Sequence, residues 1–257
     1  QSNLKEVVMG SGITKIGKSA FENCEKLTKV NIGNNVTVIE EKAFKNCVAL
    51  EKITIPGAVL RIGSSAFEGC KKLKSLSLKE GLLQIGNKAF YKCGALKSVK
   101  IPRSVLQIGK YAFADCSRLG KFTFAQDASL LRVGTGMLQN AVSLKKVKLP
   151  DKLQTIPDYM FRNAGKLEIG SSVTKIGNST FQGCKKLQKL TLPEQVQTIG
   201  KRAFYQCKKL KKVTIRTLQL RKVGKEAFRG CRTKIQFAVP KEKQTVYAKL
   251  LKGKYGK

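Results

Sequence analysis

An aromatic position recurs along the chain at nearly constant spacing, and this repeat limits the possible folds more than any other feature. Most successive positions are 23 residues apart, and the remaining gaps are 25, 20 and 24 residues. Around each position the sequence follows V-x-x-I-G-x-x-A-F-x-x-C-x-x-L-x-x-V-x-I-P. A unit this short cannot bury its own apolar face, so neighbouring units must stack. The ten positions are Phe21, Phe44, Phe67, Phe90, Phe113, Leu138, Phe161, Phe181, Phe204 and Phe228.

The two halves of each unit predict different local structure. The segment L-x-x-V-x-I alternates apolar and polar residues, as in Leu50, Ile53 and Ile55, and this two-residue period is typical of a strand. A proline such as Pro56 often closes it, since proline cannot donate to a strand ladder. The G-x-x-A-F-x-x-C half is too short for a long helix. We expect a tight turn with a short helical or 3₁₀ segment there.

The ends of the chain fit a stack of such units. Leu4 and Val7 align with Leu27 and Val30, so we expect the chain to begin in mid-repeat, with other residues upstream. Residues 1–240 then form one repeat domain, and residues 241–257 form a C-terminal capping helix and a basic tail. Within 241–252 the i,i+4 apolar pairs are Val246 with Leu250 and Tyr247 with Leu251, which predict a helix over the last open core layer.

The motif I-G-x-x-A-F-x-x-C-x-x-L-x-x-V-x-I-P resembles the BspA-like, or treponemal-type, leucine-rich repeat. The resemblance covers about residues 4–240, although Ala141 and Ala164 replace the cysteine in two units. It implies an α/β repeat fold: a right-handed leucine-rich-repeat solenoid with one parallel strand per unit of about 23 residues. It also implies a cell-surface or secreted protein of a host-associated microbe, in a family associated with adhesion to host matrix proteins or other cells.

We interpret the eight cysteines as core residues. Each lies three residues after the phenylalanine position, in a place that alanine fills in two units. A position shared by Cys and Ala favours a small buried apolar group, so we expect free thiols. A straight ladder of thiols also does not converge on one metal ion. The cysteines are Cys24, Cys47, Cys70, Cys93, Cys116, Cys184, Cys207 and Cys231.

Composition argues against an enzyme. The chain has no histidine, which is the commonest general base and metal ligand. It also lacks a phosphate-binding loop motif, because its Ile-Gly pairs recur with the repeat and not as G-x-x-x-x-G-K-[ST]. We expect no catalytic residues, no metal and no cofactor. If a cleft exists, the irregular stretch 120–170 is where broken periodicity would create it.

The charge balance favours an acidic partner. The chain has 51 Lys and Arg against 16 Asp and Glu, a formal net charge of +35. Such a surface keeps a protein soluble and attracts polyanions. Specific nucleic-acid binding is not expected, because the exposed strand positions lack aromatic residues for base stacking. No apolar stretch is long enough for a transmembrane helix, so we expect no membrane insertion.

Lysines gather at the outward positions of the predicted strands, and we call these positions the lysine lane. The lane is either a binding surface or an ordinary solvated strand face that guards against aggregation, and the sequence leaves both open. The partner would be a host matrix or cell-surface protein, or an anionic glycan or polymer, bound by a monomer. The alternative function is a passive spacer that displays other domains. The candidate residues are Lys29, Lys52, Lys100, Lys121, Lys146, Lys148, Lys189, Lys212 and Lys234.

Overall fold

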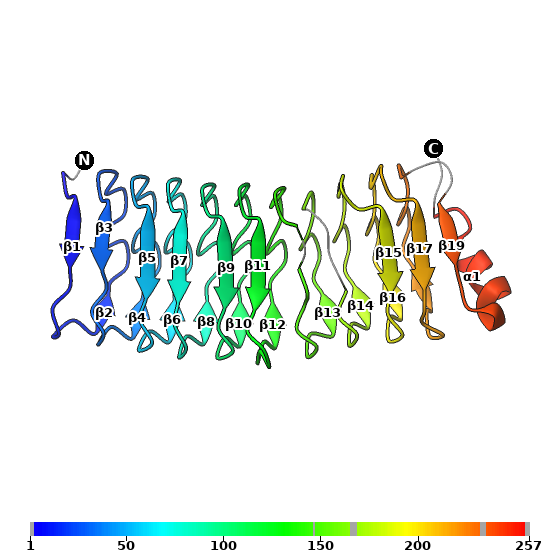
Figure 1. The fold of residues 1–257 in the computed structure, drawn as a ribbon, viewed down its shortest axis with the longest axis horizontal. Helices are drawn as coiled ribbons and strands as arrows, with labels where there is room; N and C mark the ends of the chain where they lie inside the picture. The colour runs from blue at the N-terminus through cyan, green and yellow to red at the C-terminus, as the bar shows by residue number, and fades with distance from the viewer. Residues whose placement is uncertain (1–2, 146, 165–168, 232–234, 255–257) are drawn as a thin grey trace. The chain divides into compact units, whose positions relative to one another are not determined.

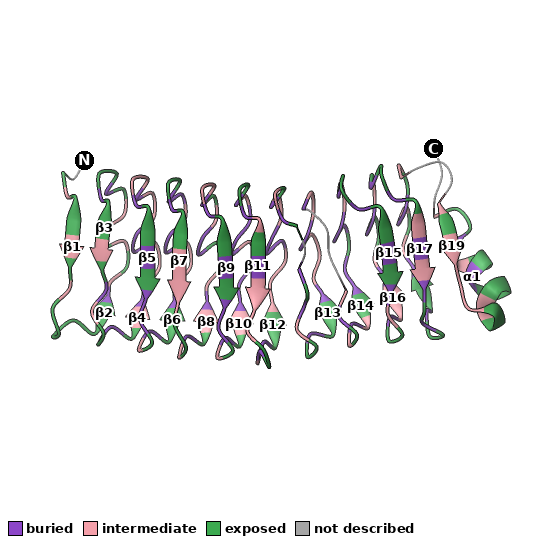
Figure 2. Ribbon diagram, in the orientation of Figure 1, coloured by how far each residue is buried: buried purple, intermediate pink, exposed green. Residues whose placement is uncertain are grey.

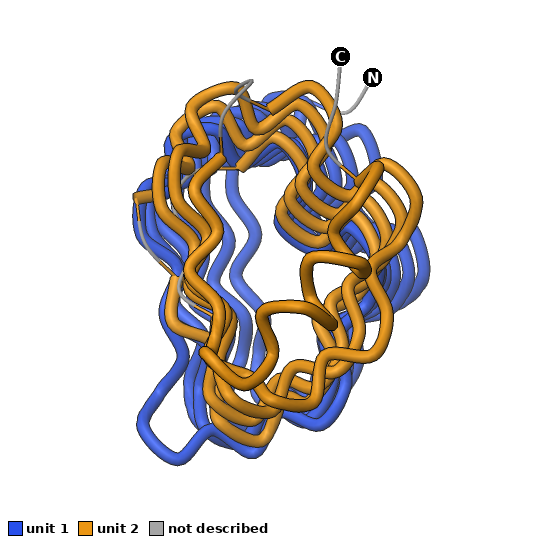
Figure 3. The backbone as a smooth tube through the Cα atoms, turned by 90° about the vertical axis from the view of Figure 1, so that its right-hand side faces the viewer, with its two compact units in different colours: residues 1–144 blue, residues 145–257 orange. Residues whose placement is uncertain are grey.

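The computed structural model describes residues 3–145, 147–164, 169–231 and 235–254. The chain forms two compact units, Gln1–Leu144 and Lys145–Lys257, each a stack of similar turns (Figures 1 and 3). Each unit is a parallel-strand solenoid, and the chain has about ten turns with about 23 residues per turn. The predicted fold class is confirmed, whereas the predicted domain boundary at residue 240 stays a prediction.

The first unit carries two sets of parallel strands. The predicted strands pair as β1 (Glu6–Val8) with β3 (Lys29–Asn31), β5 (Lys52–Ile55) with β7 (Ser75–Leu78), and β9 (Ser98–Ile101) with β11 (Lys121–Phe124). A second set of two-residue strands forms one sheet in the order β12-β10-β8-β6-β4-β2. Its members are β2 (Lys15–Ile16), β4 (Val38–Ile39), β6 (Arg61–Ile62), β8 (Gln84–Ile85), β10 (Gln107–Ile108) and β12 (Arg132–Val133).

The second unit repeats this arrangement. Its longer strands form a parallel sheet in the order β15 (Lys189–Leu192), β17 (Lys212–Ile215) and β19 (Gln236–Ala238). Its short strands form another, in the order β13 (Thr155–Ile156), β14 (Lys175–Ile176), β16 (Thr198–Ile199) and β18 (Lys222–Val223). A 3₁₀ turn η1 (Lys241–Lys243) and the helix α1 (Gln244–Leu251) follow β19.

The short strands and the turn half differ from the sequence expectation. In V-x-x-I two outward residues separate two buried ones, so the segment lacks the alternation that identifies a strand. The half around each phenylalanine forms hydrogen-bonded turns in place of a helical or 3₁₀ segment. In the second turn Lys42 and Asn46, two residues before and after Phe44, have positive φ values of 58° and 60°. Left-handed residues on both sides of each phenylalanine prevent the run of helical dihedrals that a helix needs.

The phenylalanine rings form the centre of each unit. In the first unit the rings of Phe21, Phe44, Phe67, Phe90 and Phe113 stack with centroids 5.1–5.2 Å apart, and Leu138 is fully buried at the next position. In the second unit the rings of Phe161, Phe181, Phe204 and Phe228 stack at 5.0–5.7 Å. Figure 2 shows buried and exposed residues alternating along β5 and β9. Burying each phenylalanine contributes about 1.5–3 kcal/mol.

Helix α1 packs against the last described turns of the second unit. Its Tyr247 and Leu251 are buried, whereas Val246 is 52% exposed, so only one of the two predicted apolar pairs faces the core. The Tyr247 hydroxyl donates a hydrogen bond to the carbonyl of Thr217 at 2.9 Å and accepts one from the N–H of Leu220 at 3.1 Å. These bonds satisfy backbone groups where another turn would otherwise continue the stack. Residues 255–257 of the predicted tail lie outside the described residues.

The ring stack generates a graded prediction about stability. We expect Phe67→Ala to lower the free energy of unfolding by about 3–5 kcal/mol, because a cavity would open between two neighbouring rings. Phe67→Leu should cost less than half as much, since Leu138 already fills the equivalent position in another turn. Guanidinium unfolding followed by circular dichroism measures both. Equal losses for the two variants would contradict this prediction, because they would show that stacking of the aromatic rings matters more than filling the apolar position.

The cap generates a second prediction. Tyr247→Phe keeps the ring but leaves the Leu220 N–H and the Thr217 carbonyl without their partner. We expect a loss of about 1–3 kcal/mol in unfolding free energy, because buried polar groups would be left unpaired. Val246→Ala, on the exposed side of the same helix, serves as the matched control and should change stability by less than about 0.5 kcal/mol. A Tyr247→Phe variant as stable as the wild type would contradict a structural role for the hydroxyl.

Candidate strand-face binding site

In the first unit the strands place the candidate lysines on the outer face. Lys29, Lys52, Lys100 and Lys121 are all exposed, and their strand neighbours Ile53 and Phe122 are buried. The parallel register sets Lys29 opposite Glu6, Lys52 opposite Ser75, and Lys121 opposite Ser98. The lysine lane of this unit is therefore interrupted by two serines and begins with a carboxylate.

In the second unit two lane lysines are direct neighbours. Lys189 on β15 lies opposite Lys212 on β17, with Thr191 and Thr214 opposite each other two residues on. Lys148 and Lys189 are exposed and Lys212 is half-buried. Adjacent parallel strands are about 4.8 Å apart, and two ammonium groups at that spacing repel by about 1 kcal/mol in water. This pair contributes nothing favourable to folding, so an anionic group between the two side chains would relieve the repulsion. Lys146 lies outside the described residues.

The predicted alignment of Lys234 is wrong. In the structure Lys212 pairs with Gln236 and Val213 with Phe237, so Gln236 occupies the lane at β19. The prediction of Lys234 in the lane implies that Ile235, which follows it, takes the inward apolar position. Phe237 takes that position instead, with its ring packed edge-on against Phe228 at 5.3 Å. Lys234 itself lies outside the described residues.

Most of the acidic residues that form ion pairs lie away from the lysine lane. Glu40 pairs with Lys15 at 2.9 Å and Glu226 with Arg229 at 2.6 Å, and the neighbouring bases hold the pKa of each carboxyl below its usual value. Of the lane lysines that the structure describes, Lys29 alone forms an ion pair, with Glu6. The six others, without a carboxylate partner in the described part of the chain, are Lys52, Lys100, Lys121, Lys148, Lys189 and Lys212.

The cysteines are free, as predicted, and each thiol after the first donates a hydrogen bond within the core. Cys70 Sγ lies 3.3 Å from the carbonyl oxygen of Phe44, and Cys93 Sγ lies 3.2 Å from that of Phe67. The same bond to the phenylalanine of the preceding turn recurs within both units. Burial raises the pKa of Cys47 and of Cys116 to about 12 and that of Cys70 higher than usual. These thiols are structural, since the thiolate is the reactive form.

The acidic residues in the turns serve as hydrogen-bond acceptors between turns. Asp158 accepts from the N–H of Asn178 at 2.6 Å and from its side-chain amide at 3.1 Å. Asp115 accepts from the side-chain amide of Asn140 at 2.6 Å. Among the residues that the structure describes, no group of three His, Cys, Asp or Glu side chains could hold a metal ion.

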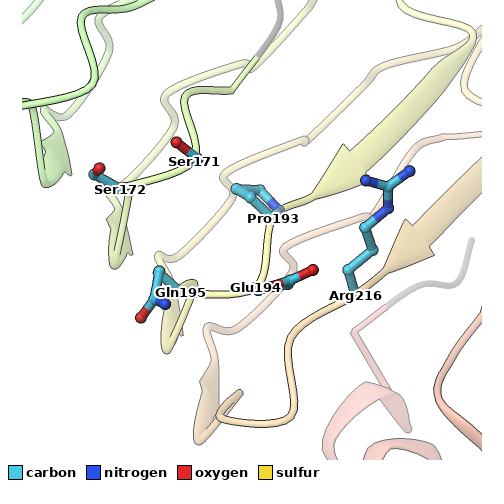
Figure 4. A pocket seen from close by; sticks show the side chains of 6 residues that line it. All are labelled: Ser171, Ser172, Pro193, Glu194, Gln195 and Arg216. Carbon is cyan, nitrogen blue, oxygen red and sulfur yellow. The ribbon is translucent and has the colours of Figure 1, made fainter.

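A shallow, open pocket of about 340 Å³ lies on the second unit. Ser171, Ser172, Pro193, Glu194, Gln195 and Arg216 line it, from neighbouring turns (Figure 4). Glu194 and Arg216 place opposite charges on one wall, and the serine hydroxyls lie across from them. The pocket begins just beyond the 120–170 stretch where the sequence suggested a cleft. The Ser171 hydroxyl donates a long hydrogen bond to the Asp151 carboxylate at 3.5 Å.

In the described ranges, no helix has the length and apolar character needed to cross a membrane.

Comparison with protein families gives a match along almost the whole chain. A family model described as "BspA type leucine rich repeat region" matches in six copies, over residues 1–120, 37–168 and 163–254. A search of curated proteins gave no significant match.

Solved structures with the same fold come from bacteria. The leucine-rich repeat protein TpLRR of T. pallidum is 29% identical, with a TM-score of 0.56, over 71% of this chain and 78% of that one. The pneumococcal vaccine antigen PcpA is 21% identical with a TM-score of 0.50, over 98% and 77%. A leucine-rich repeat protein from Bacteroides ovatus is 27% identical with a TM-score of 0.47, over 98% and 84%.

The buried thiols generate a prediction about reactivity. We expect Cys47, Cys70, Cys93, Cys116 and Cys207 to resist a thiol reagent in the native protein, even at pH 10, because burial raises their pKa values. All eight cysteines should react after unfolding in guanidinium. Peptide mapping by mass spectrometry identifies the labelled positions. Rapid native labelling of Cys93 would contradict the described core.

Proposed function

Because the chain belongs to the BspA-type leucine-rich repeat family, we propose that it is a non-catalytic binding module that takes a polyanionic partner on its strand face. One observation carries the proposal. The lane lysines on β5, β9, β11, β15 and β17 have no carboxylate partner in the described part of the chain, whereas Glu22, Glu40, Glu41, Glu51 and Glu226 pair elsewhere. The strand face, which is the extended surface of the solenoid, therefore carries positive charge that no described carboxylate neutralises.

The partner is a host matrix or cell-surface protein, or an anionic glycan or polymer, and the protein acts at the cell surface or outside the cell. The family resemblance supports this location. A polymer suits the lane because its candidate residues recur with the turns, so a chain of anionic groups can meet several lysines at once. Threonines beside the lysines, such as Thr191 and Thr214, offer hydroxyl groups to sugar or phosphate oxygens.

The second candidate is a passive spacer, and the first unit supplies the observation that favours it. Glu6 neutralises Lys29, and Ser75 and Ser98 separate Lys52 from Lys121. Lysines at such intervals also serve to keep strand faces soluble. A spacer binds no anionic partner at physiological salt.

The lane is tested with a charge-matched pair of triple variants. Lys121→Glu, Lys189→Glu and Lys212→Glu together reverse the lane. Lys110→Glu, Lys201→Glu and Lys225→Glu reverse three exposed lysines that lie three residues before the phenylalanine position. The probe is heparin, as a sulfated glycan, measured by isothermal titration calorimetry in about 0.15 M salt.

We expect at least a tenfold loss of affinity in the lane variant and less than a threefold loss in the control, although both lose the same net charge. Wild-type affinity should also fall steeply with salt, because each neutralised lysine releases a counterion. Equal losses in the two variants would show attraction by overall charge alone. Absence of wild-type binding to heparin and to a teichoic-acid polymer would favour the spacer.

A further inference from the structure

Four exposed leucines form a row in the first unit, apart from the lysine lane. Leu60, Leu83, Leu106 and Leu131 each lie immediately before a short strand, β6, β8, β10 or β12. Their side chains are 46%, 41%, 39% and 65% exposed. Large apolar side chains are scattered singly on most protein surfaces, so four at one repeat position in successive turns need an explanation.

Backbone hydrogen bonds hold these leucines in register. The N–H of Leu83 donates to the carbonyl of Leu60, that of Leu106 to Leu83, and that of Leu131 to Leu106, each at 2.9 Å. The leucines therefore lie on adjacent turns at about 4.8 Å spacing, and the row extends about 14 Å from first to last. We call this row the leucine stripe.

The fold does not require leucine at this position. The preceding turns of the same unit have Thr14 and Thr37 there, and the Thr37 hydroxyl donates to the Thr14 carbonyl at 3.1 Å. In the second unit Thr174 likewise donates to the Gln154 carbonyl at 3.3 Å. Threonine satisfies the same backbone and avoids exposing apolar surface, so leucine in four successive turns serves something other than stability.

Polar residues that border the stripe indicate the charge of its partner. The residues after the four leucines are Arg61, Gln84, Gln107 and Arg132, aligned in register on the short-strand sheet. Both arginines are exposed, and neither forms an ion pair with a described residue. The border is thus neutral at its centre and cationic at its two ends, which suits a partner that carries carboxylates beside an apolar ridge.

We propose that the leucine stripe is a second interaction surface, which takes an acidic amphipathic helix of a partner protein. Apolar side chains three or four residues apart on a helix are about 5–6 Å from each other, close to the spacing of the leucines. About ten helical residues span the 14 Å of the stripe. A second copy of this chain is a poor occupant, because both molecules carry a net charge of +35.

The test uses a synthetic alanine-rich peptide with leucines every three or four residues over about ten residues and glutamates beside them. A scrambled peptide of the same composition has the same charge without the apolar ridge. Fluorescence anisotropy measures binding to the wild type and to a stripe variant with Leu60→Thr, Leu83→Thr, Leu106→Thr and Leu131→Thr. Circular dichroism and the unfolding midpoint establish that the variant folds, as the native threonines at this position lead us to expect.

We expect the stripe variant to bind the amphipathic peptide at least tenfold more weakly than the wild type, and the scrambled peptide to bind equally weakly to both. Arg61→Gln with Arg132→Gln should weaken binding severalfold and make it less dependent on salt. The stripe variant should keep its affinity for heparin, so this proposal can fail independently of the lane. The proposal is overturned if the stripe variant binds the amphipathic peptide as tightly as the wild type does, or if the wild type binds the scrambled peptide as tightly as the amphipathic one. Self-association of the wild type that the stripe variant loses, seen by sedimentation, assigns the stripe to a second copy instead.

Discussion

Every other feature of each unit depends on backbone hydrogen bonds that hold one turn in register with the next. Around the phenylalanine the bonds point forward, as the N–H of Phe44 donates to the carbonyl of Ala66 in the following turn at 2.7 Å. In the short strands they point back, as the N–H of Gly63 donates to the carbonyl of Ile39 at 2.7 Å. The turns are therefore about 4.8 Å apart. This spacing places the ring centroids of Phe44 and Phe67 5.1 Å apart, and it brings each thiol within hydrogen-bonding distance of the phenylalanine carbonyl in the preceding turn. Left-handed residues on both sides of the phenylalanine make the forward bonds possible, because they turn alternate N–H groups in the same direction.

The sequence predicted the core well because its signal is periodic. Phenylalanine and cysteine recur at fixed offsets, so their burial follows from the need of each unit to stack. The left-handed positions were missed, although Asn23, Asn46 and Gly69 are residues that favour that conformation. Lysine or glutamine occupies the equivalent place in other turns, as Lys92 and Gln206 do, which hides the pattern. Backbone geometry imposed by neighbouring turns overrides the local preference of these side chains.

Prediction of the candidate site was less complete, for two physical reasons. Alternation along a strand identifies which residues face outward, and the described lane lysines do so. It does not fix the register of a degenerate strand, and Phe237 rather than Ile235 took the inward position in β19. The leucine stripe was not predicted, because the repeat pattern V-x-x-I leaves the position after the valine open to any residue. Only the structure shows that the apolar residue before each leucine is buried and that the leucine itself is exposed.

Outward positions carry the functional information in a solenoid of this kind. Inward side chains and the backbone together satisfy the fold, and even these tolerate change, as Leu138 and Ala141 occupy a phenylalanine and a cysteine position while buried. An outward residue is not needed for stacking, so the residue type at an outward position can differ between successive turns. Where neighbouring turns nevertheless keep one costly residue type, a stacking requirement cannot be the cause. Exposed leucine is costly in water in a way that lysine is not, so the leucine stripe is the stronger sign of a partner, and the lysine lane depends more on its experimental test.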